Sequence, residues 1–343
     1  MVQVPSTTKT TKPCGSCSKD TWQACAGCKD APIVISGPKP VYYCSKECQK
    51  TDWKKHKSVC QVLQRRKMIY RAGDLLQRIF NVFRKEVHGQ RLAKIERRGS
   101  KLYLHEGKLI QGDMAEISSK LRDLSKLLDE MRWTEEDRNA ALAHNASWCA
   151  IVHMHHIAKY ILKDFSSEIF EVTFIPKDHI EKVVRIDAEG AVMAASEHMV
   201  WSLKLDGSNE TYIVDITGAQ FGMYKPVMPW DHYRQYHILE DPTLLKFRSN
   251  GTFLANANVR YGAQTGKRTD QSELSLSHLV YATISEALMR KLLAWEKDTV
   301  ILKDMLSTAK TSEFEKMRDE LVEAISMGLK ECIKNFSEKV KAN

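Results

Sequence analysis

Apolar residues recur at helical spacing in three parts of the chain. The first part runs from Gln61 to about Glu86, the second from Ile117 to Trp133, and the third covers residues 278–341. The third part has room for two helices, and the last of these opens with Ser312 and Glu315 at the spacing of a capping box. We therefore expect one helix in each of the first two parts and two long helices at the end of the chain.

Short apolar runs of the kind that strands use lie between these helical parts. A helical stretch follows Thr134, and a polar loop is expected from Gln264 to Ser277. The segment Asp-Gly-Ser-Asn at 206–209 is typical of a turn, so the runs on its two sides are predicted to pair as a hairpin. A smaller hairpin is expected around Leu102 to Ile110. The β-like runs are 169–175, 183–186, 198–205 and 212–216.

The order of these elements predicts an α+β domain, in which a helix precedes antiparallel strands, followed by C-terminal α-helices. The first residues carry no hydrophobic pattern and are expected to be disordered. The predicted division of the chain is 1–12 as a tail, 13–60 as a cysteine-rich finger, 61–133 as a helical connector with a small hairpin, 134–261 as the α+β domain, and 278–341 as C-terminal helices.

Composition narrows the class of protein. No run approaches the ~18 apolar residues that are needed to cross a bilayer, so no membrane partner is expected. The residues after Met1 are polar and lack the apolar region of a secretory signal. These features predict a soluble protein of the cytoplasm or the nucleus.

The formal net charge of +9 is concentrated at one end of the chain. Residues 1–71 hold 14 Lys and Arg against 4 Asp and Glu, whereas the rest of the chain holds 38 against 39. If the seven cysteines of that segment bind two Zn²⁺ as thiolates, its charge of +10 falls to about +7. We interpret the excess as a solvated surface that balances the metal sites. A surface for nucleic acid or an acidic partner is the alternative.

The cysteine-rich segment has the spacing of a metal-binding finger. Pairs of the form Cys-x2-Cys place two thiolates on one tight turn, and His56 and Cys60 at i and i+4 share a helical face. Eight ligands predict two closed zinc sites. A disulfide framework is the competing interpretation, but seven cysteines leave one unpaired, and a reducing compartment keeps thiols free. The ligand run is Cys14-x2-Cys17-x7-Cys25-x2-Cys28-x15-Cys44-x3-Cys48-x7-His56-x3-Cys60.

Residues 14–60 resemble the MYND finger, because the residues between the ligands match as well as the ligands. The matching run is Tyr43-Cys44-Ser45-x-x-Cys48-Gln49-x-x-Asp52-Trp53-x-x-His56-Lys57-x-x-Cys60. The resemblance implies an interleaved pairing that spacing alone leaves open, and two structural Zn²⁺ as cofactors. In that pairing Cys14, Cys17, Cys44 and Cys48 hold one zinc, while Cys25, Cys28, His56 and Cys60 hold the other.

The same resemblance implies a protein partner, since MYND fingers typically bind short proline-containing peptides. Gln49 and Trp53 lie one helical turn apart and offer an amide beside an indole, so they are the candidate peptide-binding residues. Trp53 could equally be a core residue of a small finger. A finger joined to an uncharacterised domain is similar to the arrangement of fungal MYND proteins, which implies a regulatory or adaptor role such as transcription regulation.

Two enzyme classes are the alternatives to this function. The sequence lacks the Asn-His-Ser-Cys motif and the Gly-rich cofactor turns of SET-domain methyltransferases. Cys149, His198 and Asp215 occur in the order used by transglutaminase-like and papain-like folds, and they are the candidate catalytic residues of a thiol acyl-transfer enzyme. A buried cysteine in an alanine-rich helix is the alternative interpretation of Cys149.

Overall fold

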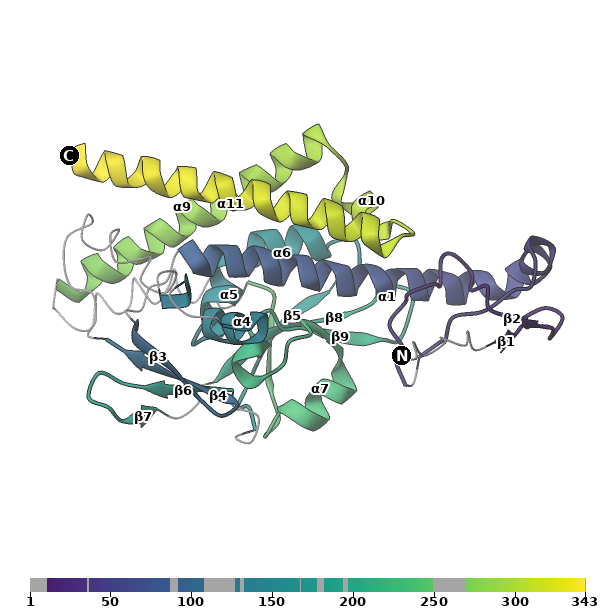
Figure 1. Ribbon diagram of the computed structural model, residues 1–343, viewed down its shortest axis with the longest axis horizontal. Helices are drawn as coiled ribbons and strands as arrows, with labels where there is room; N and C mark the ends of the chain where they lie inside the picture. The colour runs from purple at the N-terminus through teal and green to yellow at the C-terminus, as the bar shows by residue number, and fades with distance from the viewer. Residues whose placement is uncertain are drawn as a thin grey trace, which may run out of the picture.

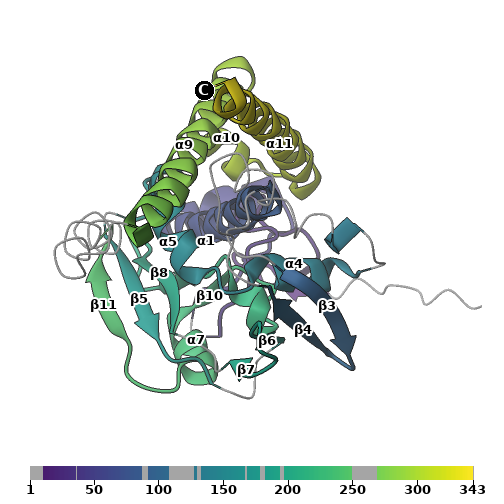
Figure 2. The ribbon, with the colours of Figure 1, turned by 90° about the vertical axis from the view of Figure 1, so that its left-hand side faces the viewer.

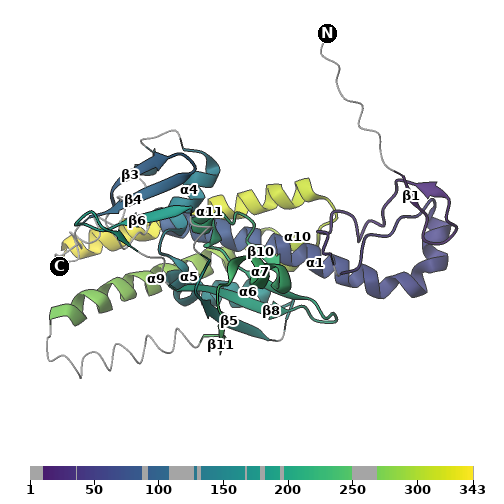
Figure 3. The ribbon, with the colours of Figure 1, turned by 90° about the horizontal axis from the view of Figure 1, so that it is seen from below.

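The computed structural model describes residues 11–35, 37–86, 92–107, 127–129, 133–166, 168–177, 182–193, 197–248 and 269–342. The cysteine-rich finger lies at one end of the long axis of the molecule, and the sheets and the C-terminal helices lie toward the other end (Figure 1, Figure 3). The order predicted from the sequence, a finger followed by a helix, antiparallel sheets and C-terminal helices, is confirmed.

Helix α1 (Lys46–Glu86) joins the finger to the rest of the molecule. Ser45 precedes it and caps it, because its Oγ accepts a hydrogen bond from the amide of Cys48 at 3.2 Å. The helix expected from Gln61 to Glu86 is confirmed, but it is the second half of this longer element. The predicted boundary at residue 60 therefore falls within one continuous helix. Figure 2 shows α1 between the sheets on one side and α9 and α11 on the other.

The larger sheet is antiparallel throughout, with the strand order β10-β9-β8-β5-β11. The hairpin predicted around residues 206–209 is confirmed as β8 and β9, with Trp201 opposite Val214. Helices cover both faces, which explains why most residues of its central strands are buried. Its strands are β5 (Ile169–Phe174), β8 (His198–Lys204), β9 (Thr211–Val214), β10 (Val227–Pro229) and β11 (Thr243–Lys246).

A smaller sheet has the order β3-β4-β6-β7, and its β4–β6 pair is parallel. The hairpin expected around Leu102 to Ile110 is displaced: residues 101–106 form one strand, whose partner precedes it in the sequence. Most exposed positions of that partner strand are charged, and only Leu92 and Ile95 are buried. Its sequence therefore lacks the apolar alternation that predicts a strand. The strands are β3 (Leu92–Arg98), β4 (Lys101–Glu106), β6 (Val183–Ile186) and β7 (Val192–Met193).

The helical stretch expected after Thr134 is divided into three helices, and α7 follows the larger sheet. At the end of the chain α9 begins at Thr269, so part of the loop expected from Gln264 to Ser277 is helical. Helix α11 begins at Thr311, which places Ser312 inside the helix and not at its cap. Most of the helix expected from Ile117 to Trp133 lies outside the described residues. The helices are α4 (Glu135–Ala143), α5 (Ser147–His153), α6 (His155–Leu162), α7 (Trp230–His237), α9 (Thr269–Asp298), α10 (Leu302–Ser307) and α11 (Thr311–Ala342).

The main hydrophobic core lies where α1 packs against α5, α6, the larger sheet and the C-terminal helices. Val34 of the finger belongs to this core, together with Trp201 and Tyr212 of the sheet. A second cluster on the other face of the sheet contains Val200 and Tyr233. Within the part of the chain that the structure describes, no helix combines the length and apolar character that crossing a membrane requires.

Candidate metal centres and neighbouring sites

The finger is built from two similar turns that are held together by short β-contacts. The amide of Ser18 donates to the carbonyl of Cys14 at 2.9 Å. The amide of Lys29 donates to the carbonyl of Cys25 at the same distance. Strands β1 (Lys12–Pro13) and β2 (Asp20–Thr21) pair antiparallel. Tyr42 forms isolated β-bridges with both halves of the finger, one with Cys14 and one with Ala24. Lys12, expected in the tail, therefore belongs to the finger.

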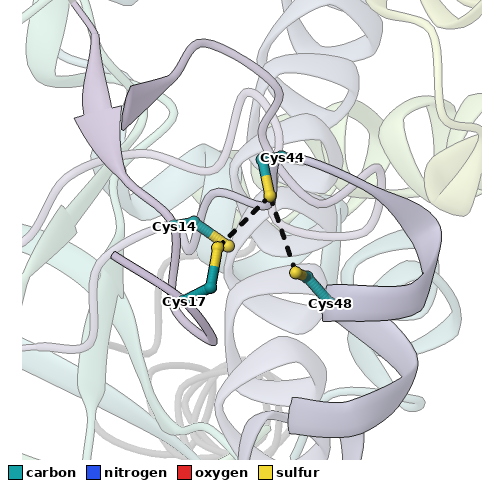
Figure 4. A group of neighbouring side chains, drawn as sticks. All are labelled: Cys14, Cys17, Cys44 and Cys48. Atoms are coloured by element: carbon teal, nitrogen blue, oxygen red, sulfur yellow. Dashed lines mark hydrogen bonds between the residues drawn. The ribbon is translucent and has the colours of Figure 1, made fainter. Parts of the chain in front are cut away.

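The first candidate metal centre combines the first turn of the finger with the start of α1. Cys14 and Cys17 lie on the turn, Cys44 precedes the helix, and Cys48 lies in its first turn (Figure 4). The Cys44 sulfur lies 3.4 Å from that of Cys17 and 3.5 Å from that of Cys48. This centre is partly open to solvent, because Cys17 is exposed.

The second candidate metal centre is fully buried. It joins Cys25 and Cys28 of the second turn to His56 and Cys60, which lie one turn apart on α1. The Cys25 and Cys60 sulfurs are 3.8 Å apart, and Nε2 of His56 is 3.3 Å from the Cys28 sulfur. The two groups are the same as those of the interleaved pairing that the family resemblance implies.

Both ligand sets fit a tetrahedral Zn²⁺. Bonds of about 2.3 Å from zinc to sulfur place two sulfurs about 3.8 Å apart, and within each centre all four ligand atoms lie within 4.8 Å of one another. Four protein ligands leave no open position for water, so these sites are structural.

The pKa values of Cys25 and Cys28 explain why the buried centre needs a cation. The contact with Cys28 lowers the pKa of Cys25 to about 4, against the opposing effect of burial. The same contact, together with burial, raises the pKa of Cys28 above its ordinary value. Thiols this close cannot all ionise together unless a divalent cation balances their charge.

Two glutamines support the buried centre, and the ligand spacing did not reveal this role. Nε2 of Gln49 donates to the Cys25 sulfur at 3.2 Å, and Nε2 of Gln64 donates to the Cys60 sulfur at 3.3 Å. Such bonds orient ligands and offset part of their charge. Gln49, a candidate peptide-binding residue, is thus also a neighbour of the metal centre.

The other candidate peptide-binding residue, Trp53, lies on α1 with 41% of its surface exposed. Its ring meets the His56 ring edge to face, with centroids 6.0 Å apart. The Tyr43 ring also packs edge to face against the His56 ring, with centroids 5.5 Å apart, and its hydroxyl donates to Asp52 at 2.7 Å. Trp53 is therefore held in place by the finger while part of its indole faces solvent.

The structure brings together two of the three candidate catalytic residues. His198 and Asp215 are buried, and Nε2 of His198 lies 3.0 Å from a carboxylate oxygen of Asp215. Tyr233 donates to the same oxygen at 2.7 Å, and the amide of Thr217 donates to the other at 3.0 Å. Burial alone would raise the pKa of Asp215, but His198 and these hydrogen bonds lower it below its ordinary value.

Cys149 is not brought to this pair. Side chains alternate along a strand, so His198 and Val200 face the cluster beneath α7, whereas Trp201 faces the main core. Cys149 packs against that main core on the other side of the sheet. Accordingly, Nδ1 of His198 has no hydrogen-bond partner among the described residues, and burial raises the pKa of the Cys149 thiol. The thiol-enzyme hypothesis stays a prediction, and this geometry does not support it.

Comparison with known proteins bears on the finger alone. Residues 14–60 match the MYND finger family. No solved structure matches the chain. The matched residues include all eight ligands of the two centres, so residues 14–60 are a two-zinc MYND finger, a type of domain that generally mediates protein interactions.

Proposed function

We propose that the finger binds short proline-containing peptides of a partner protein, with Trp53 and Gln49 as the contact surface, and that the chain is an adaptor or regulatory protein. The exposed indole of Trp53 is the observation that carries this proposal. Because the finger holds this partly exposed indole in place against His56, its free face offers a surface on which a proline ring can pack. Cysteine ligands that are not paired in disulfides also favour a reducing compartment, such as the cytoplasm or the nucleus.

The chemistry of the two side chains suits an extended peptide. A proline ring packs well against an indole face, and the polyproline conformation loses little entropy on binding. The amide nitrogen of Gln49 is directed to the Cys25 sulfur, which leaves its oxygen to accept a hydrogen bond from a peptide amide. The metal centre thus fixes the orientation of a peptide-contacting group.

The test is capture of labelled proline-containing peptides by the full, zinc-loaded chain. Trp53→Ala should weaken binding by about tenfold or more, the size expected for a central aromatic contact. Trp22→Ala is the matched control, because Trp22 is a tryptophan of the same finger with 60% of its surface exposed. Equal affinity of the Trp53→Ala variant and the wild type would place the contact surface elsewhere. Gln49→Ala requires a zinc assay alongside, because Gln49 also bonds to Cys25.

A nucleic-acid partner would give a different result. Lys54, Lys55 and Lys57 are exposed on α1, but Arg66 is buried and ion-paired, so it cannot contribute to such a surface. Binding to phosphates falls steeply with salt, because it releases counterions. The nucleic-acid alternative would be favoured by two results together: substitution of these three lysines weakens binding of an oligonucleotide, and Trp53→Ala leaves peptide affinity unchanged.

A further inference from the structure

A groove between α6 and α9 lies outside the finger and outside the His198–Asp215 pair. It has a volume of about 470 Å³, within the usual range of ligand sites. Each helix contributes residues at i, i+3, i+4 and i+7, so each presents one continuous face. From α6 and its C-cap these are His156, Lys159, Tyr160 and Lys163, and from α9 they are Glu286, Met289, Arg290 and Leu293.

The floor of the groove is apolar and fixed in position. Tyr160 donates a hydrogen bond to Glu296, and Met289 packs against the main core. Ser285 donates to the carbonyl of His153, which ties α9 to the helix that precedes α6. Leu293 exposes 43% of its surface at the edge. The groove is therefore built from packed helices, and its apolar surface faces solvent.

The rim carries an excess of positive charge. Among the residues that line the groove, Lys159, Lys163 and Arg290 are cationic and Glu286 is the one carboxylate, while the carboxylate of Glu296 accepts the hydrogen bond from Tyr160. Arg290 lies 3.8 Å from that carboxylate, and Nζ of Lys163 lies 3.9 Å above the Tyr160 ring. Among the described residues, no carboxylate pairs with Lys159. This local excess contrasts with residues 72–343 as a whole, where 38 Lys and Arg face 39 Asp and Glu.

We propose that this groove binds an acidic amphipathic helix of a partner protein. Two helix faces with an apolar floor form the receptor side of a helix-in-groove interaction, and the cationic rim selects acidic residues beside the apolar ones. A nucleic acid would not use the apolar floor, and a bilayer would not enter a concave site. This binding site does not depend on the peptide surface of the finger.

The experiment uses the full zinc-loaded chain and a panel of fluorescent peptides. Each peptide has roughly 15 residues, about four helical turns, with Leu or Phe at i, i+3, i+4 and i+7 and with Asp or Glu elsewhere. Matched peptides carry Asn and Gln in place of the acids. We expect the acidic peptides to bind and the neutral ones to bind at least about tenfold more weakly, equivalent to about 1.4 kcal/mol.

Variants locate the site. Lys159→Glu combined with Lys163→Glu, and separately Leu293→Asn, should each weaken the acidic peptides by about tenfold or more. All three residues are exposed, so the fold should be retained. Lys303→Glu, an exposed lysine of α10, is the matched control and should leave the affinity unchanged. Trp53→Ala should also leave it unchanged, which separates this site from the finger.

Three results would overturn the proposal. In the first, no peptide of the panel binds. In the second, the Lys159 and Lys163 reversals leave the affinity unaltered. In the third, phosphatidylserine vesicles or a single-stranded oligonucleotide bind through these lysines while the peptides do not. The last result would assign the groove to a lipid surface or a nucleic acid.

Discussion

Arg66 of α1 forms a buried ion pair with Glu210, at the turn between β8 and β9. Its guanidinium also donates to the carbonyls of Pro32 and Pro38, at 2.9 and 3.0 Å, in the loop between the two halves of the finger. Gly37 passes directly over this pair, where a Cβ would collide with both side chains. One side chain therefore joins the finger, the long helix and the larger sheet.

Arg66→Met should destabilise the protein by about 3–5 kcal/mol, because it leaves two carbonyls without their donor and leaves the partly buried Glu210 without its cation, bonded to the Tyr212 hydroxyl. Urea unfolding of the zinc-loaded protein measures this change. Arg234→Met is the matched control: Arg234 pairs with Asp241 at 2.7 Å, but both side chains are exposed, so its loss should change stability by less than about 1 kcal/mol. Similar effects of the two substitutions would contradict the role given to the buried pair.

Zinc content should be close to two ions per chain by elemental analysis, one for each ligand set. Removing them with a chelator should unfold the finger, since the ~10–16 kcal/mol of binding at a structural site is also folding energy. Cys44→Ala should lose the exposed centre and weaken the buried one, because the two ligand sets alternate along the chain. One zinc per chain in the wild type would refute the two-centre arrangement.

The effect of zinc loss should extend beyond the finger. Val34 packs in the main core with Trp201, and the Pro32 and Pro38 carbonyls hold Arg66. Chelation should therefore lower the urea midpoint that tryptophan fluorescence reports for the sheet domain. An unchanged midpoint would mean that the finger and the sheet domain fold independently.

The metal ligands could be predicted from the sequence because zinc chemistry is strict and local. Few residue types bind the ion, and both turns and the α1 pair have short spacings. The pairing of the ligands needed the family resemblance, since Cys17 and Cys44 meet only after the chain folds back. Strands and helices of the α+β domain could also be distinguished in the sequence, because the spacing of apolar residues differs between the two kinds of element.

The long-range polar contacts could not be predicted from the sequence. Arg66 lies among basic residues and resembles part of a solvated helix face, yet Glu210 is distant in sequence and removes it from water. The order of Cys149, His198 and Asp215 was also insufficient, because sequence order does not reveal which face of the sheet a strand residue occupies. Strand β3 was missed because most of its exposed positions are charged and only Leu92 and Ile95 are buried, so its apolar residues do not alternate along the strand.

Asp215 should make stability depend on pH in the acid range. Its pKa is lowered in the folded protein, so the stabilisation is present above the unfolded value of about 3.9 and is lost as pH falls through the folded value. Asp215→Asn should remove this part of the acid dependence while also weakening the bonds to His198 and Tyr233. Acid also strips zinc, so the measured quantity is the difference in slope between variant and wild type below about pH 4. Asp241→Asn, with an exposed side chain, is the control.

Cys149 should react slowly with iodoacetamide at about pH 7, because the thiolate is the reactive form and burial raises the pKa of this thiol. We expect its rate to be no faster than that of Cys332, which is also half-buried. His198→Ala should leave the Cys149 rate unchanged, since the His198 ring bonds to Asp215 on the other face of the sheet. Mass spectrometry of the labelled, zinc-loaded protein distinguishes the two cysteines. Rapid labelling of Cys149 that disappears in the His198→Ala variant would instead show that imidazole activates the thiol, and it would revive the acyl-transfer hypothesis.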